Sequence, residues 1–314
     1  MNISDLETPS LAAFLYREGQ SLLKIAGQTN ARTGISWLQD KIIRLQELLE
    51  ECWDEKSGNY QYRDMQSHRS PTGATIKAFM GSGTFQTKIT LAHPSRLVIH
   101  LELEDENTRR INLKICGIGE TGSVSEEIKV RDFIWSSYFA QYTTNNLFIK
   151  ISNIEISGLH EQDHCQIKTA DYTQKDITQL MPLWAGMISK ERAKLLVEST
   201  IKDQYLEPFG IPVCPQLNNP SSHPTSAHVH IPWNHLVGEG LINYNYYNLA
   251  ADLVTRLMKG YINYLKKSEA FREMIHCKNG KPSGTRNHLR GLAPLGLFIT
   301  VLGVQYIKDD KIIL

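Results

Sequence analysis

The sequence predicts an α+β fold in which an antiparallel β module is inserted between helical hairpins. Apolar residues recur at three- and four-residue spacing through about the first 55 residues and again from Asp176 to Leu302, which is typical of amphipathic helices. Between Phe79 and Ile167 apolar residues instead alternate with polar ones, with a period of two residues, as in half-buried strands. Because the helical pattern resumes after the strands, we expect both helical parts to belong to one domain.

Two helices are predicted at the start of the chain. One apolar stripe consists of Leu11, Phe14, Leu15, Leu22, Leu23 and Ile25. A second stripe consists of Trp37, Leu38, Ile42, Ile43, Leu45, Leu48 and Leu49. The polar, turn-rich stretch between Gly27 and Gly34 separates them, so the pair forms an αα-hairpin. We expect residues 1–75 to be a hairpin, 76–168 the β module and 169–314 the remaining helices.

The β module contains four runs with clear alternation, at residues 97–103, 111–115, 127–130 and 148–151. Clusters of Asp, Asn and Gly separate these runs, and about ninety residues are enough for a small sandwich. In the last part of the chain, the pattern predicts one long helix from Asn234 to Leu265, with an interruption near Gly240 as the alternative, and a buried helix from Leu289 to Gly303.

Charge and cysteine content exclude several function classes. The net charge is +1, from 34 basic and 33 acidic residues that are intermixed, so we expect no nucleic-acid partner. No stretch approaches the ~18–20 apolar residues that span a bilayer, and the N-terminus lacks the features of a signal peptide. The five cysteines are odd in number and far apart, which favours reduced thiols and a cytoplasmic protein without a membrane partner.

The most specific segment runs from Gln179 to Gly303. It contains Met181-Pro182-Leu183-Trp184-Ala185-Gly186, Ile231-Pro232-Trp233-Asn234-His235, Gly238-Glu239-Gly240-Leu241, Phe271-Arg272-Glu273-Met274-Ile275 and Gly291-Leu292-Ala293-Pro294-Leu295-Gly296. This run resembles the C-terminal half of an (α/α)6 six-hairpin glycosidase, of the trehalase, processing α-glucosidase, mannosylglycerate hydrolase and amylo-α-1,6-glucosidase kind. The resemblance implies a partial (α/α)6 helical-hairpin toroid with an inserted antiparallel β module.

Glu273 is the candidate general base. Hydrolysis of a glycosidic bond generally needs two carboxylic groups. Glu273 lies between Phe271 and Ile275 and precedes a Gly-rich turn. At a helix end beside apolar residues, its pKa can rise toward a useful value. The resemblance implies that Glu273 acts as the base, whereas the alternative is an exposed glutamate at a helix terminus.

Trp233, Asn234 and Glu239 are the next candidates. The resemblance implies that Trp233 and Asn234 line a sugar subsite, with Glu239 as a support inside the helix. An aromatic face stacks on sugar C–H groups, and an amide both donates and accepts hydrogen bonds. The alternative is that Trp233 is a core residue and Asn234 caps a helix.

Three further residues are candidate sugar contacts. Asp176 and Trp184 correspond to positions near the sugar in the resembling families, although Asp176 also suits a helix cap. Arg286 belongs to the element Gly284-Thr285-Arg286-Asn287. Related sequences carry an acidic residue in this element, whereas this chain has the neutral hydroxyl of Thr285.

A metal site is the weakest interpretation. His228 and His230 have the spacing of a pair on one strand face, with His223 and His235 nearby. No Cys or Glu completes a tetrahedral set at standard spacing. We therefore expect neither a metal nor a cofactor.

The resemblance implies a glycoside hydrolase acting on α-linked glucosides or mannosides by inversion. In that family the general acid precedes the hairpin that begins here at Asp5-Leu6. We therefore expect this chain to be incomplete or inactive alone, with a carbohydrate ligand and a complementary N-terminal barrel fragment as partners. The alternative is a non-catalytic remnant that binds carbohydrate or another protein.

Overall fold

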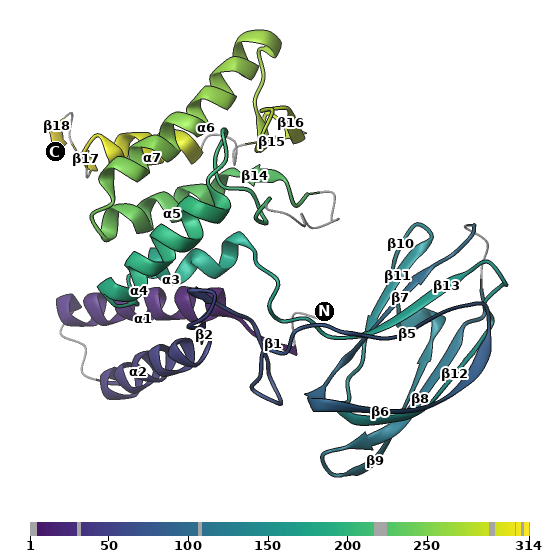
Figure 1. Cartoon of the computed structure of the whole chain (residues 1–314). Coiled ribbons are helices and arrows are strands. Elements are labelled where there is room, and N and C mark those ends of the chain that lie inside the picture. The colour runs from purple at the N-terminus through teal and green to yellow at the C-terminus, as the bar shows by residue number, and fades with distance from the viewer. Residues whose placement is uncertain are drawn as a thin grey trace. The chain divides into compact units, whose positions relative to one another are not determined.

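The computed structural model describes residues 5–29, 33–105, 109–216, 225–288, 293–304, 306–308 and 311–313. The chain forms two compact units (Figure 1). Unit 1 consists of Met1–Glu7 and Tyr62–Gln174, and unit 2 consists of Thr8–Gln61 and Lys175–Leu314. Unit 1 is built mainly from strands and unit 2 mainly from helices, so the α+β prediction is confirmed.

Unit 1 is a pair of antiparallel sheets. The five-stranded sheet has the order β10 (Ile134–Ser136), β11 (Phe139–Thr143), β7 (Leu97–Glu102), β13 (His164–Thr169) and β5 (Thr75–Met80). The four-stranded sheet has the order β6 (Gly83–Ser95), β12 (Phe148–Ser157), β8 (Asn112–Gly119) and β9 (Gly122–Lys129). The four alternating runs of the sequence fall mainly in β7, β8, β9 and β12.

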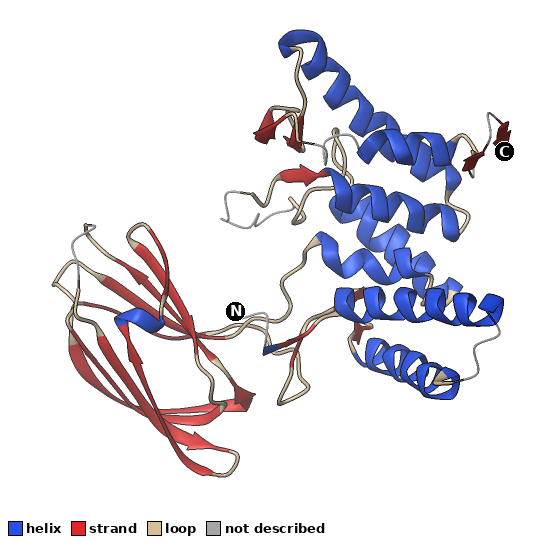
Figure 2. Ribbon diagram, turned by 180° about the vertical axis from the view of Figure 1, so that it is seen from behind, coloured by secondary structure: helices blue, strands red, loops and turns tan. Residues whose placement is uncertain are grey.

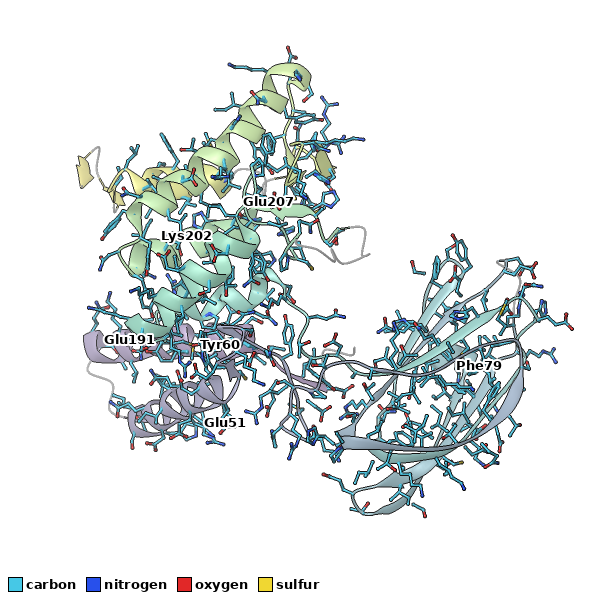
Figure 3. All side chains as sticks on the ribbon, in the orientation of Figure 1. Glu51, Tyr60, Phe79, Glu191, Lys202 and Glu207 are labelled. Atoms are coloured by element: carbon cyan, nitrogen blue, oxygen red, sulfur yellow. The ribbon has the colours of Figure 1, made fainter. Side chains whose placement is uncertain are left out.

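The alternation in these strands builds the core of unit 1. On β7, Leu97, Ile99 and Leu101 are buried in one cluster with Ile115 of β8. Phe79 of β5 packs against the same cluster (Figure 3). The intervening residues of each strand point to the opposite face, because side chains alternate along a strand.

Asp64 joins the beginning of unit 1 to its end. It lies on β4 (Arg63–Asp64), which pairs with β1 (Leu6–Glu7). Its Oδ2 accepts hydrogen bonds from Arg96 Nε at 2.6 Å and Tyr172 Oη at 2.8 Å. Burial opposes ionisation, but the Ser67 amide, the Tyr172 hydroxyl and Arg96 outweigh it and lower the pKa of the Asp64 carboxyl.

Unit 2 is built around a row of four helices, which we call the helix row. Its members are α1 (Pro9–Thr29), α3 (Met181–Ala185), α5 (Ile231–Asn243) and α7 (Ala293–Val301), and each packs on the next (Figures 1 and 2). The other helices are α2 (Ile35–Glu51), α4 (Lys190–Leu195) with the π-helix Leu196–Tyr205, and α6 (Tyr247–Ser268). In the part of the chain that the structure describes, no helix has the length and hydropathy that spanning a bilayer requires.

Short sheets complete unit 2. They are β2 (Trp53–Asp54) with β3 (Asn59–Tyr60), β17 (Tyr306–Lys308) with β18 (Lys311–Ile313), and β14 (His228–His230) with β15 (Arg272–His276) and β16 (Pro282–Arg286). Tyr60 is fully buried among the helices (Figure 3). Strand β14 of the three-stranded sheet directly precedes α5, so its pairing with β15 fixes where that helix begins.

The predicted αα-hairpin is present, but its apolar stripes are only partly buried. Ala13, Ile42 and Leu49 lie in the core of unit 2. Several large apolar side chains of α1 and α2 are exposed, namely Leu11, Leu15, Leu22, Ile25, Trp37 and Ile43. A helix in a globular protein usually buries such a stripe, so these helices present an unusually apolar surface.

Two helix predictions are wrong in detail. The segment from Asn234 to Leu265 is not one helix, because α5 ends at Asn243 and α6 begins at Tyr247. Asn245 between them adopts a left-handed φ of 67°, which a continuous helix does not allow. Of the predicted buried helix from Leu289 to Gly303, residues 289–292 lie outside the described residues. In α7, Leu297 is buried whereas Leu295 and Phe298 are exposed.

We predict that Asp64→Ala destabilises unit 1 by roughly 3–5 kcal/mol, because it leaves the buried Arg96 guanidinium without its partner. The free energy of opening is measured by native-state hydrogen exchange of the β7 amides. Since folding lowers the pKa of Asp64 from its usual 3.8, its ionic contribution is present above about pH 4 and declines as the pH falls further.

The matched control is Glu127→Ala. Glu127 is 54% exposed and pairs with Lys129 at 3.8 Å, so its loss should change stability by no more than about 1 kcal/mol. Equal effects of the two substitutions would contradict a central role for Asp64.

Candidate functional site

Glu239 of α5 connects three helices of the helix row. Its Oε2 accepts a hydrogen bond from Trp184 Nε1 of α3 at 2.8 Å and lies 3.7 Å from Arg17 Nη2 of α1. Its Oε1 lies 3.2 Å from His235 Nε2, one turn earlier on α5. The His235 contact is the main cause of a lowered pKa at Glu239; burial opposes it, and Trp184 and Arg17 reinforce it. Glu239 is therefore an ionised carboxylate with both oxygens engaged.

The glycines on either side of Glu239 allow this arrangement. A Cβ at Gly240 would lie 2.8 Å from the backbone nitrogen of Trp184, and a Cβ at Gly238 would collide with Leu297 of α7. Residues without a side chain thus let α5 approach α3 on one side and α7 on the other. The sequence Gly-Glu-Gly places the carboxylate where those helices meet.

Three aromatic rings lie beside the carboxylate. Phe14 of α1 is 4.9 Å from the ring centre of Trp184 and 6.1 Å from that of Trp233. The Arg17 guanidinium lies 4.1 Å from the Trp184 ring centre, a distance typical of a cation–π contact. We call Phe14, Arg17, Trp184, Trp233, His235 and Glu239 the aromatic–carboxylate cluster.

The cluster combines three aromatic rings with a carboxylate, a guanidinium and an imidazole. Its rings offer apolar faces, and its charged groups are only partly buried, with the side chain of Arg17 40% exposed and that of Glu239 29% exposed. Aromatic faces together with a few placed polar groups are typical of small-molecule sites. Of the predicted residues, Trp184, Trp233 and Glu239 are brought together here.

Phe14, Arg17 and His235 were not predicted as site residues. His235 and Glu239 are four residues apart on one helix, a spacing that places side chains side by side and was visible in the sequence. Phe14 and Arg17 are likewise three residues apart on α1. Their contact with α3 and α5 depends on helix packing across more than 160 residues of sequence, which no local pattern reports.

Glu273 lies apart from the cluster, on strand β15. The prediction that it lies at a helix end is wrong, because residues 272–276 pair with β14 and β16. Its side chain is 17% exposed, and His288 Nδ1 lies 3.9 Å from Oε2. A Cβ at Gly284 would lie 2.6 Å from Glu273 Cγ, so glycine there leaves room for the carboxylate.

Asn234 and Asp176 stabilise backbone segments. The fully buried Asn234 side chain accepts a hydrogen bond from Ile211 N and donates one to Ile211 O, each at 2.8 Å. Asp176 caps the short helix Ile177–Leu180, since its Oδ1 accepts from Thr178 N at 2.8 Å. For Asp176 the structure therefore shows the alternative role, that of a helix cap.

Arg286 lies on the exposed strand β16, opposite Arg272 of β15. His228 and His230 lie on β14, and His223 lies outside the described residues. Within the described ranges, no group of three His, Cys, Asp or Glu residues is placed to hold a metal ion.

The sequence matches no protein-family model and no curated protein. The fold, however, matches that of GH63 mannosylglycerate hydrolase from Thermus thermophilus over 94% of this chain, with a TM-score of 0.51 and 16% identity. The predicted resemblance is confirmed at the level of the fold. The chain covers 45% of that hydrolase.

A second six-hairpin glycosidase gives the same result. Neutral trehalase from Saccharomyces cerevisiae matches 95% of this chain with a TM-score of 0.52 and 12% identity, and the chain covers 38% of it. This chain thus spans less than half the length of the glycosidases whose fold it shares. At such low identity the likeness concerns the fold alone.

We predict that Gly240→Ala destabilises unit 2 by roughly 1–3 kcal/mol, because the new methyl group meets backbone atoms of α3 that cannot move aside easily. Urea unfolding followed by hydrogen exchange of the α5 amides measures the change.

Gly27→Ala is the matched control, since a Cβ at Gly27 of α1 meets nothing within 4 Å. There we expect stabilisation of roughly 0.5–1 kcal/mol from the higher helix propensity of alanine. The same sign for both variants would show that α5 and α3 are not in close contact.

Proposed function

We propose that this chain supplies the carbohydrate site of a glycoside hydrolase that acts on α-linked glucosides or mannosides. The observation that carries the proposal is the aromatic–carboxylate cluster on the helix row. Two glycosidases with this fold, a mannosylglycerate hydrolase and a trehalase, support it. The first has also been solved with Tris and D-glycerate.

In this proposal the helix row is part of an (α/α)6 toroid. Helices α1 and α2 pack as one hairpin and α5 and α6 as another, while α3 is followed along the chain by the α4 segment. In this arrangement α7 would begin a further hairpin. A complementary N-terminal barrel fragment would supply the remaining helices. Its apolar faces would cover the exposed side chains of α1 and α7, such as Leu11, Leu15 and Phe298.

Glu273 is the proposed general base. Its carboxylate accepts no hydrogen bond from the described residues, so its lone pairs are available to a water molecule. Glu239 is unsuited to proton transfer, because Trp184, His235 and Arg17 occupy both of its oxygens. We assign Glu239 to holding Trp184 and Arg17 in place for the sugar.

The general acid would come from the complementary fragment. Inverting hydrolases hold their two carboxyl groups roughly 6.5–9.5 Å apart, with a water molecule between the base and the sugar. In that arrangement Glu273 takes the proton of the attacking water, while the acid protonates the departing oxygen. Arg286, exposed on the neighbouring strand, would contact the sugar, whereas Asn234 and Asp176 support the surrounding backbone.

A second candidate function is carbohydrate binding without hydrolysis. It is favoured by one observation, that the carboxylate of the cluster is fully engaged in holding its neighbours. The experiment below separates the two functions.

We predict that the chain hydrolyses α-glucosyl fluoride or α-mannosyl fluoride. Fluoride ion departs without being protonated, so this reaction needs a base but no general acid. Glu273→Gln should lower the rate by about 10² to 10⁴, the usual contribution of a general base. Fluoride release is followed with an ion-selective electrode, and NMR of the first product reports whether the anomeric configuration inverts.

Glu269→Gln is the control for the charge change. Glu269 is an exposed carboxylate at the end of α6, and its replacement should leave the rate unchanged. Failure of the unsubstituted chain to hydrolyse both fluorides, with methyl α-glucoside or α-mannoside still bound, would favour the non-catalytic function.

The cluster itself is tested by Arg17→Met, which keeps the apolar stem and removes the guanidinium. We expect the affinity for methyl α-mannoside or methyl α-glucoside to fall roughly tenfold, as for a lost charged hydrogen bond. Calorimetry measures the affinity. Arg44→Met is the control, since Arg44 is an exposed residue of α2 that pairs with Glu47 of its own helix. Unchanged binding in the Arg17 variant would remove the cluster from the sugar site.

A further inference from the structure

We propose that the outward face of the five-stranded sheet in unit 1 is a second binding site, specific for a neutral carbohydrate. Strands β11, β7, β13 and β5 form this surface, which we call the sheet face. It shares no residue with the helix row or with the strand that carries Glu273. The inference therefore stands independently of the proposed hydrolysis.

The strand register arranges polar side chains in rows across the sheet face. In the middle row, Gln141 of β11 is opposite His100 of β7, and His100 is opposite Gln166 of β13. In the next row, Lys168 of β13 is opposite Thr75 of β5. The residues between them on β7 and β13, including Ile99, Cys165 and Ile167, are buried in the core. Alternation therefore directs the polar set outward.

These side chains are not used by the protein itself. Within the described residues, the side chains of Thr75, His100, Gln141, Gln166 and Lys168 make no hydrogen bond or ion pair. Elsewhere in unit 1, polar side chains are engaged within the protein, as the buried Glu126 is with Tyr142 and Asn145. A row of donors and acceptors without protein partners on one surface is what a hydrogen-bonding ligand requires.

A cavity lies at this surface. It has a volume of about 280 Å³, and Thr75, His100, Gln141, Lys168 and Asp171 contribute to its lining. That volume is close to the lower end of the roughly 300–1,000 Å³ typical of ligand pockets. It therefore suits a single sugar ring better than a large cofactor.

The charges in the cavity offset one another. Lys168 is a cation and Asp171 an anion, and one Asp171 oxygen is already held by the amide and hydroxyl of Thr173 at 3.0 and 2.7 Å. Burial, and then Lys168, lowers the pKa of His100, so its imidazole is neutral at pH 7. With no net charge and both donors and acceptors, the cavity favours hydroxyl groups over phosphate or carboxylate.

An aromatic surface lies on the same strand as Gln141. Phe139 is two residues away on β11, hence on the same face, and is 46% exposed. Its ring centre is 4.5 Å from that of Tyr138. Residues two apart on a strand are about 7 Å from each other, so a short oligosaccharide reaches from the cavity to Phe139. The rings would stack on the C–H face of a second sugar.

The test is calorimetric titration of the full chain with maltotriose and with α-linked mannotriose. Binding of either sugar is expected for the unsubstituted chain. His100→Leu and Lys168→Met should each weaken it roughly tenfold or more. Lys114→Met is the matched control, because Lys114 is exposed on the other sheet of unit 1, and it should leave the affinity unchanged. Circular dichroism verifies that each variant is folded.

Two further variants separate this site from the proposed catalytic site. Glu273→Gln should bind the trisaccharides as the unsubstituted chain does, even if it hydrolyses nothing. Binding that is lost in Arg17→Met but retained in His100→Leu would place the sugar in unit 2 and overturn the inference. The inference would also be overturned if neither trisaccharide bound, or if His100→Leu, Lys168→Met and Lys114→Met all bound with equal affinity.

Discussion

The closeness of α5 to its neighbours in the helix row sets the geometry of unit 2. Gly240 brings α5 against the backbone of α3, and Gly238 brings it against Leu297 of α7. Only at that separation can the short side chain of Glu239 reach the indole of Trp184 directly. Trp184 in turn positions Phe14 and Arg17 of α1. One pair of glycines thus determines where a carboxylate, a cation and three rings meet.

Local patterns predicted the fold well where the interactions are local or strictly periodic. The period of two in residues 97–103 and 148–151 identified strands, because each of these strands has a buried face. Periodicity failed for residues 272–276, which form a strand that pairs with residues 282–286 and also with His228–His230 from more than forty residues away. The sequence offered Gly240 as the place for a break in the helix after Asn234, whereas the break lies at Asn245, where a non-glycine residue adopts a left-handed conformation.

The candidate site was predictable only in part, because some of its contacts also join distant parts of the chain. Trp184, Trp233 and Glu239 stand out in the sequence through their glycine and proline neighbours, and the structure gathers them. Arg17 and Phe14 lie in an ordinary amphipathic stripe, and nothing local distinguishes them from core residues. Asn234 illustrates the converse case: an amide beside a tryptophan suggested a sugar contact, yet its partner is the Ile211 backbone.

The hydrogen bond between Tyr172 and Asp64 has a consequence for the order of folding. It joins residues 108 positions apart, near two of the three points where the chain passes between unit 1 and unit 2. Docking α3 on the α1–α2 hairpin before unit 1 has formed means closing a flexible loop of about that length. Once unit 1 is folded, the effective loop is only a few residues long. The loop length is then halved about four times, which lowers the entropic free-energy cost of closing the loop by roughly 2 kcal/mol. The β unit therefore acts as a covalently attached template that accelerates assembly of the helices.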